Sequence, residues 1–251
     1  MLVTSQKPRN ESGDLQMRAS ADALRLWWLP LLAGLLPAVG IAIAFPLAVA
    51  EGQFASCNPL IDGCVSISRA GRHGLPNILF RAFLLAGAVL QGTVWCLTPL
   101  WLRSLGALPV RRFTWMMWLG VAAALFLVLY GTFLGTEGAG YRWMRRYGVI
   151  FYFGFTAILM LGVGGAVWRA AKAGAALGSW PVLLLASVIA LPLAGIANSF
   201  APLVMNDAAA LDRFENATEW WAGLAFTVFF ALLAVLWRRT GCAARLQTFG
   251  G

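Results

Sequence analysis

Six long apolar stretches dominate this sequence and limit the folds that are open to it. Each is close to the roughly 20 residues that a helix needs to cross about 30 Å of hydrocarbon. Inside a bilayer every unpaired backbone group costs several kcal/mol, and a helix pairs these groups within its own segment. The sequence therefore predicts six transmembrane helices, which we place at residues 27–50, 78–102, 113–135, 147–168, 180–205 and 220–237.

The composition agrees with this prediction. The chain of 251 residues is 60% hydrophobic and only 12% charged. Water-soluble domains are about 45 to 50% apolar and about 25% charged. We expect an all-α fold, a polytopic integral membrane protein whose six helices form a bundle with the N and C termini in the cytoplasm.

The domain organisation is simple. Residues 1–26 form a polar tail of mixed charge without the short apolar core of a cleaved signal peptide, and residues 238–251 form a second tail. Residues 27–237 form one transmembrane domain, and its only long connection is the extracytoplasmic loop 51–77. We expect both tails to be cytoplasmic.

Prolines inside the first and fifth stretches predict departures from straight helices. Pro30, Pro37 and Pro46 lie in the first stretch, which should therefore kink or start late. Pro192 should bend the fifth. Tryptophans gather at the predicted span ends, as in the aromatic belt of membrane proteins.

The distribution of positive charge predicts the topology. Of 19 Lys and Arg residues, twelve fall on the side of both tails and seven on the other side. Cytoplasmic loops carry the excess of Lys and Arg, so this side should be cytoplasmic. The Ala/Leu/Gly/Arg-rich composition is typical of a GC-rich bacterial genome, and we expect a multi-pass protein of the inner (plasma) membrane. Arg142, Arg145 and Arg146 cluster on the opposite side, which marks a topology error or a binding feature.

The long loop 51–77 holds much of the polar chemistry. Cys57 and Cys64 could form a disulfide if the loop faces an oxidising compartment. His73, the only histidine, is a weak candidate for a general base that Asp62 or Glu137 would orient. Ser66 and Ser68 have hydroxyl groups that could act as nucleophiles, but no activating motif accompanies them. Turn capping is the simpler role.

Several functional classes find no support in the sequence. The arginines do not form a basic patch interleaved with aromatics, which argues against nucleic-acid binding. One histidine cannot supply paired haem ligands, no predicted span contains a lysine for retinal, and glycine-rich nucleotide loops are missing. No Cys/His cluster has metal-ligand spacing, so we expect neither metal nor cofactor. The span middles lack ionisable residues, which disfavours ion-coupled transport.

Polar residues gather instead at the outer ends of the predicted spans. Arg81 and Glu219 lie where apolar helix has already begun, so we expect them to pair with each other or with another partner. Arg81 and Arg142, with Arg145 or Arg146, are suited to grip a phosphate through parallel hydrogen bonds. The candidate residues for binding a lipid or its headgroup are Arg72, Arg81, Glu137, Arg142, Arg145, Arg146, Asn198 and Glu219.

The loop also resembles a known family. The run from Ser66 to Ser68, followed by Pro76 and by Phe80 at the start of the next span, is similar to a motif of a six-span family. This family comprises the DRAM autophagy modulators, the yeast Sfk proteins and the Golgi post-GPI-attachment factor that helps to remodel GPI-anchor lipid. Two further features are similar: an acidic residue before an aromatic-rich fourth span, in residues 137–155, and the pair Glu219-Trp220.

The resemblance implies a lipid-related role in the outer or lumenal leaflet. The chain departs from the family pattern at three places, where relatives carry proline, an acidic residue and histidine: Cys64 or Val65, Asn77, and the arginines at 142, 145 and 146.

Our leading hypothesis is a protein that binds a lipid headgroup in an extracytoplasmic polar pocket roofed by loop 51–77, with a role in lipid remodelling or trafficking. Membrane lipids would be its partners. A second hypothesis is a membrane hydrolase or acyltransferase with His73 as the base. A third is a non-catalytic scaffold whose loop 51–77 docks a periplasmic or membrane protein, or a small transporter. A cavity open to lipid would favour the first two, and a path through both leaflets would favour transport.

Overall fold

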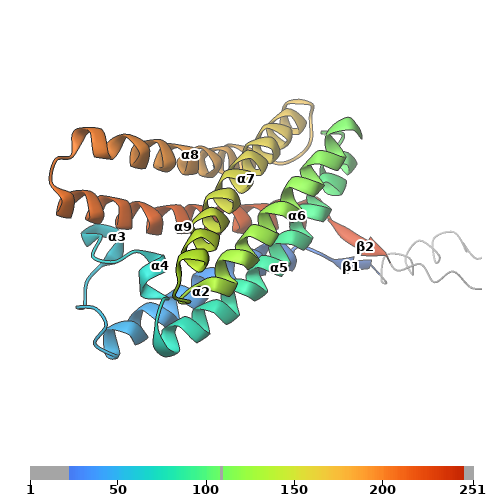
Figure 1. Cartoon of the computed structure of the whole chain (residues 1–251). Coiled ribbons are helices and arrows are strands. Elements are labelled where there is room, and N and C mark those ends of the chain that lie inside the picture. The colour runs from blue at the N-terminus through green and yellow to red at the C-terminus, as the bar shows by residue number, and fades with distance from the viewer. Residues whose placement is uncertain (1–22, 108–109, 246–251) are drawn as a thin grey trace, which may run out of the picture.

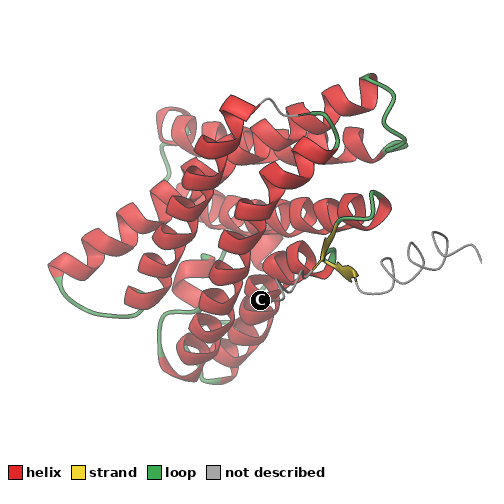
Figure 2. Ribbon diagram, turned by 90° about the vertical axis from the view of Figure 1, so that its right-hand side faces the viewer, coloured by secondary structure: helices red, strands yellow, loops and turns green. Residues whose placement is uncertain are grey.

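The computed structural model describes residues 23–107 and 110–245 and is almost entirely helical, with two short strands as the exception (Figure 2). The predicted tail segments 1–22 and 246–251 lie outside the described residues. Six helices are long and apolar enough to cross a membrane, which confirms the all-α, six-span fold. They are α2 (Trp28–Ala50), α5 (Gly74–Ser104), α6 (Val110–Phe133), α7 (Ala139–Lys172), α8 (Trp180–Val204) and α9 (Ala208–Arg239) (Figure 1).

The six helices form a bundle in which each packs against the next along the chain, and α9 packs back on α2. The helices α7 and α8 separate toward the end of the bundle that carries the α2–α5 connection (Figure 1). Aromatic side chains fill the core where α5 meets α9: Trp95 lies 6.0 Å from Phe229 and 5.7 Å from Phe230 between ring centroids.

Both described ends of the chain lie at the other end of the bundle. Strand β1 (Ala23–Arg25) pairs antiparallel with β2 (Ala243–Arg245), and the Leu26 N–H extends the pairing by donating to the Cys242 carbonyl at 3.0 Å. Burial raises the pKa of Cys242 to about 11, so this thiol stays protonated at neutral pH. The membrane side on which this end lies stays a prediction.

Helix α2 runs without interruption from Trp28 through Pro37 and Pro46, so the expected late start does not occur. Pro37 has no N–H to donate to the Ala33 carbonyl one turn earlier. The side chain of Gln91 replaces that donor, because its Nε2 lies 3.1 Å from the Ala33 oxygen. The Tyr152 hydroxyl donates in turn to Gln91 Oε1 at 2.9 Å, so one amide joins α2, α5 and α7 inside the bundle.

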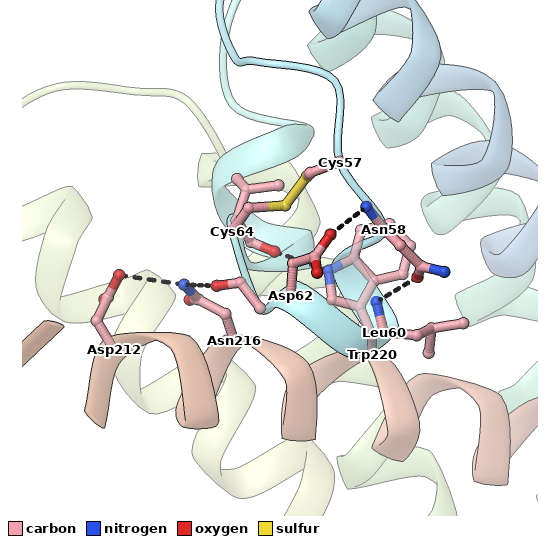
Figure 3. The surroundings of a disulfide bond; sticks show 10 residues. Cys57, Asn58, Leu60, Asp62, Cys64, Asp212, Asn216 and Trp220 are labelled. Carbon is pink, nitrogen blue, oxygen red and sulfur yellow. Dashed lines mark hydrogen bonds between the residues drawn. A yellow bond between two sulfur atoms is a disulfide. The ribbon is translucent and has the colours of Figure 1, made fainter. Parts of the chain in front are cut away.

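The connection between α2 and α5 is folded. It contains two single-turn helices, α3 (Pro59–Asp62) and α4 (Ile67–Ala70), and the disulfide Cys57–Cys64 (Figure 3). Asn58 and Ser66 cap these helices by accepting the N–H groups of Leu60 and Arg69. The predicted disulfide is present, and the capping role predicted for Ser66 is observed.

Candidate functional site

The helices α7 and α9 begin earlier than the apolar pattern predicts. Helix α7 starts at Ala139 and α9 at Ala208, in place of residues 147 and 220. The 34 residues of α7 span about 51 Å, well beyond a hydrocarbon core of about 30 Å, so its first turns can be polar. The arginines expected in a connection therefore lie on α7, and Asp212, Glu215 and Glu219 lie on the first turns of α9.

The α2–α5 connection is fastened to the polar start of α9 (Figure 3). Asn216 Nδ2 donates to the Gly63 carbonyl at 2.8 Å, and the ring nitrogens of Trp220 and Trp221 donate to the Val65 and Leu60 carbonyls at 2.8 and 3.0 Å. Arg69 forms an ion pair with Asp212. In the other direction, the Ser68 N–H donates to Glu219 Oε1 at 3.0 Å. The connection is thus a roof held to α9 by side chains along about three of its turns.

Gly63 permits this close contact. Its φ of 57° lies in the left-handed region that favours glycine. A Cβ at this position would lie 1.9 Å from the Arg213 carbonyl oxygen on α9. The roof can therefore lie directly on the helix backbone only with glycine here.

Beneath the roof, between α7, α8 and α9, lies an open cavity of about 1190 Å³, which we call the basic cavity. Five arginines and only two carboxylates line it, and its deeper wall is apolar down to Ala157 on α7 and Leu191 on α8. From Arg146 to Ala157 the wall covers about 16 Å of helix. The charged residues are Arg69, Arg72, Arg142, Arg145, Arg146, Glu215 and Glu219.

Two of the five arginines have structural partners. Arg69 is held by Asp212 and by Asn216 Oδ1 at 3.3 Å. Arg145 Nη1 donates to the Phe133 carbonyl at 3.0 Å and also to the Thr136 carbonyl. These oxygens lie at and just beyond the end of α6, where helical carbonyls lack partners in their own helix. Both side chains therefore hold secondary structure in place.

The other three arginines are available to a ligand. Within the described part of the chain, the side chains of Arg72, Arg142 and Arg146 form no hydrogen bond or ion pair. Arg72 Nε is also buried without a partner, as is Asn198 Oδ1 across the cavity. A buried polar atom without a partner costs about 1 to 3 kcal/mol. The basic cavity thus combines unpaired guanidinium groups with a free buried donor and a free buried acceptor.

A second cavity, of about 280 Å³, lies between the helices and is partly open at its rim, where Ala42 and Leu224 are exposed; we call it the apolar cavity. Side chains of α2, α5, α6, α7 and α9 line it, among them Pro37, Ile41, Leu84 and Phe230. It meets the basic cavity at four residues that line both: Tyr130, Val149, Phe153 and Glu219.

Sequence reasoning missed the apolar cavity. Two polar residues in the apolar stretches, Gln91 and Tyr152, were a usable signal. Both are buried, both line this cavity, and they bond to each other.

Six of the eight predicted binding residues line the basic cavity: Arg72, Arg142, Arg145, Arg146, Asn198 and Glu219. Arg81 and Glu137 do not. The predicted pair of Arg81 with Glu219 is wrong, because Arg81 faces α6 and its Nη2 donates to the Thr132 carbonyl at 2.7 Å. Glu219 faces the roof and accepts from Ser68. Glu137 is exposed in the α6–α7 connection.

His73 lies outside the basic cavity. It is exposed just before α5 and borders a small hollow with Gln53, Phe54 and two arginines. Its ring forms no hydrogen bond to any described residue, and Asp62 instead accepts the Asn58 N–H at 2.8 Å. The predicted orientation by Asp62 or Glu137 is therefore not observed.

We compared the chain with protein-family models, with curated proteins and with solved structures, and none of the three comparisons produced a match.

Proposed function

We propose that this protein binds an anionic, phosphate-bearing membrane lipid, with the headgroup in the basic cavity. The observation that carries the proposal is the set of unpaired arginines Arg72, Arg142 and Arg146 above an apolar wall. Guanidinium groups bind phosphate through parallel, charge-assisted hydrogen bonds. The apolar wall below them matches the tail of a lipid better than a free water-soluble anion.

The spacing of the arginines on α7 supports the proposal. Arg142, Arg145 and Arg146 are three and four residues apart, so they share one face of the helix. Arg145 also lies close enough to Arg72 and Arg142 for their charges to repel. Only Glu215 and Glu219 oppose the positive charge among the lining residues. An anion would relieve this repulsion.

We place the basic cavity in the outer leaflet of the inner membrane. The Lys and Arg distribution and the Cys57–Cys64 disulfide support this location, because disulfides persist in oxidising compartments. A role in lipid remodelling or trafficking is the finer form of the proposal. This finer role depends on the family resemblance in the run from Ser66 to Ser68, and the two serines of that run both border the cavity.

The geometry favours this function over its rivals. The two cavities end at Gly34, Gln91 and Phe230, at least six residues short of the helix ends near β1 and β2. Neither of these two cavities therefore forms a path through both leaflets of the kind that a transporter needs. A hydrolase that uses His73 would need that residue in the cavity, and it lies outside. A docking role of loop 51–77 stays a prediction.

The test measures lipid affinity of the purified full chain in nanodiscs of zwitterionic lipid. Phosphatidic acid is titrated in, and bound lipid is read by native mass spectrometry. A hydrogen bond to a charged group contributes about 1.5 to 3 kcal/mol, so Arg146→Gln should weaken binding about tenfold or more. The matched control is Arg238→Gln, at the other end of the bundle, which should change binding less than about twofold.

Inorganic phosphate and phosphatidylcholine complete the design. If inorganic phosphate competes as strongly as phosphatidic acid, the ligand is a free anion and the lipid proposal is wrong. Equal affinities for phosphatidylcholine and phosphatidic acid would likewise contradict a site built on arginine.

A further inference from the structure

We propose that an acyl chain of the bound lipid leaves the bilayer and enters the apolar cavity inside the bundle. The entrance is the boundary of Tyr130, Val149, Phe153 and Glu219, which line both cavities. This inference rests on the proposed headgroup site and adds where the hydrocarbon goes. The ligand class is a phosphate-bearing lipid with a chain that can be drawn between helices.

The two cavities have the polarity that the two parts of such a lipid need. The basic cavity carries five arginines, whereas no arginine or lysine lines the apolar cavity. Their only shared charged residue is Glu219, whose Oε1 is fixed by the Ser68 N–H. Glu219 also lies close enough to Arg69 and Arg72 for their opposite charges to attract. The lining therefore changes from polar to apolar at one boundary. A lipid changes from polar to apolar in the same way, where its headgroup joins its acyl chains.

The polar side chains of the apolar cavity are largely occupied by the protein itself. Tyr152 and Gln91 bond to each other, and Gln91 also bonds to a backbone carbonyl of α2. Thr227 Oγ1 donates to the Gly223 carbonyl at 3.0 Å, and Trp220 donates to the roof. The surface that remains is mainly hydrocarbon and aromatic. An apolar lining of this kind favours the binding of an apolar guest.

The size of the apolar cavity fits part of one chain. About 280 Å³ is several times the roughly 30 Å³ that one water molecule occupies in the liquid. The roof residues Leu60 and Ile67 close the cavity at the headgroup end, which leaves the boundary at Glu219 as its link to the basic cavity.

The test uses phosphatidic acid with a photoreactive diazirine at the end of one acyl chain. The full-length protein is illuminated in nanodiscs, and the adducts are mapped by peptide mass spectrometry. The expected adducts lie on inward residues of the apolar cavity such as Pro37, Ile41 and Phe230. Adducts confined to outward residues of α8 such as Leu193 and Phe200, or no adducts while phosphatidic acid still binds, would overturn the inference.

Two matched variants sharpen the result. Ala38→Phe puts a ring into the apolar cavity, and Ala86→Phe adds the same ring on an exposed face of α5. Displacing roughly two methylenes should reduce interior adducts about tenfold in the first variant and leave them unchanged in the second. If Ala38→Phe does not fold, Thr227→Leu tests the same wall from α9.

The failure of this inference differs from the failure of the proposed function. If Arg146→Gln weakens phosphatidic acid binding but adducts lie only on outward residues, the headgroup site stands and the chain stays in the bilayer. If Arg146→Gln has no effect on binding, the headgroup site itself is wrong.

Discussion

The two ends of the bundle carry the same kind of charge in different surroundings. At the end with β1 and β2, cations stack on tryptophans: Lys172 lies 5.4 Å from the Trp168 ring, and Arg238 and Arg239 lie 5.4 Å from the rings of Trp27 and Trp180. At the opposite end, Arg72, Arg142 and Arg146 border a cavity, and no ring among the described residues covers them. A cation that stacks on a tryptophan at a span end is thus a common feature of membrane proteins. Several unpaired cations around one cavity instead indicate a binding site.

Residue spacing explains the difference. Arg238 and Arg239 are neighbours on α9, and they lie over different rings, that of Trp27 just before α2 and that of Trp180 at the start of α8. Arg142 and Arg146 are four residues apart and share one face of α7. Consecutive arginines place their charges on different faces of a helix, whereas arginines one turn apart place them on the same face.

The largest expected effect is on ligand affinity at the cavity end. The double substitution Arg142→Gln with Arg146→Gln removes two charge-assisted contacts and should weaken phosphatidic acid binding about 100-fold or more. The matched double substitution Arg238→Gln with Arg239→Gln should change it less than about threefold. Native mass spectrometry of lipid complexes measures both, and equal losses would end the distinction between the two ends.

The next largest effect concerns the disulfide bond of the roof. Removing the Cys57–Cys64 bridge with two serines opens a loop of sequence separation 7 and should lower the free energy of unfolding by about 2 to 3 kcal/mol. Denaturant titration in detergent measures this change. Replacing the free thiols Cys96 and Cys242 by serine is the control, with an expected change below about 1 kcal/mol. A larger loss in the control would show that the roof is not specially dependent on its bridge.

A smaller effect separates two adjacent arginines. Arg145→Gln removes the donor to the Phe133 and Thr136 carbonyls and should destabilise the fold by about 2 kcal/mol. Arg146→Gln removes no hydrogen bond or ion pair with a described residue and should leave stability within about 0.5 kcal/mol. Thermal unfolding of both variants tests the assignment. Similar stability losses would mean that Arg146 is also structural.

The smallest expected effect is at the strand end. Arg238→Gln removes a cation–π contact with Trp27 and should lower stability by about 0.5 kcal/mol, the value typical of exposed sites. Arg238→Lys keeps the charge and should retain most of it. The same unfolding assay applies, and a loss near that of Arg145→Gln would contradict the comparison.

Hydropathy predicted the number and the order of the helices because lipid-facing side chains must be apolar over a fixed length. It placed the starts of α7 and α9 too late, since their first turns project beyond hydrocarbon and carry Arg142 or Asp212 in helical form. Six candidate binding residues line one cavity because they lie at the same end of the bundle, on the roof and on α7, α8 and α9 where these helices border the cavity. Arg81 was a wrong candidate because the sequence indicates how far along the span the residue lies but not which neighbouring helix its side chain faces.

The buried contacts inside the bundle were harder to predict. Nothing in the local sequence links Pro37 to Gln91, yet the proline frees a carbonyl that the glutamine binds. Pro37 also requires Gly87 opposite, where a Cβ would lie 2.7 Å from the proline ring. Such pairs depend on which helices become neighbours, and that is decided by the whole bundle.

The short ribbon of β1 and β2 has a consequence for biogenesis. Strand β1 precedes the six helices along the chain and β2 follows them, so the two strands can pair only after all six helices have been synthesised. Their pairing thus also requires the end of the last helix to lie beside the start of the first, so the ribbon reports on the closure of the bundle.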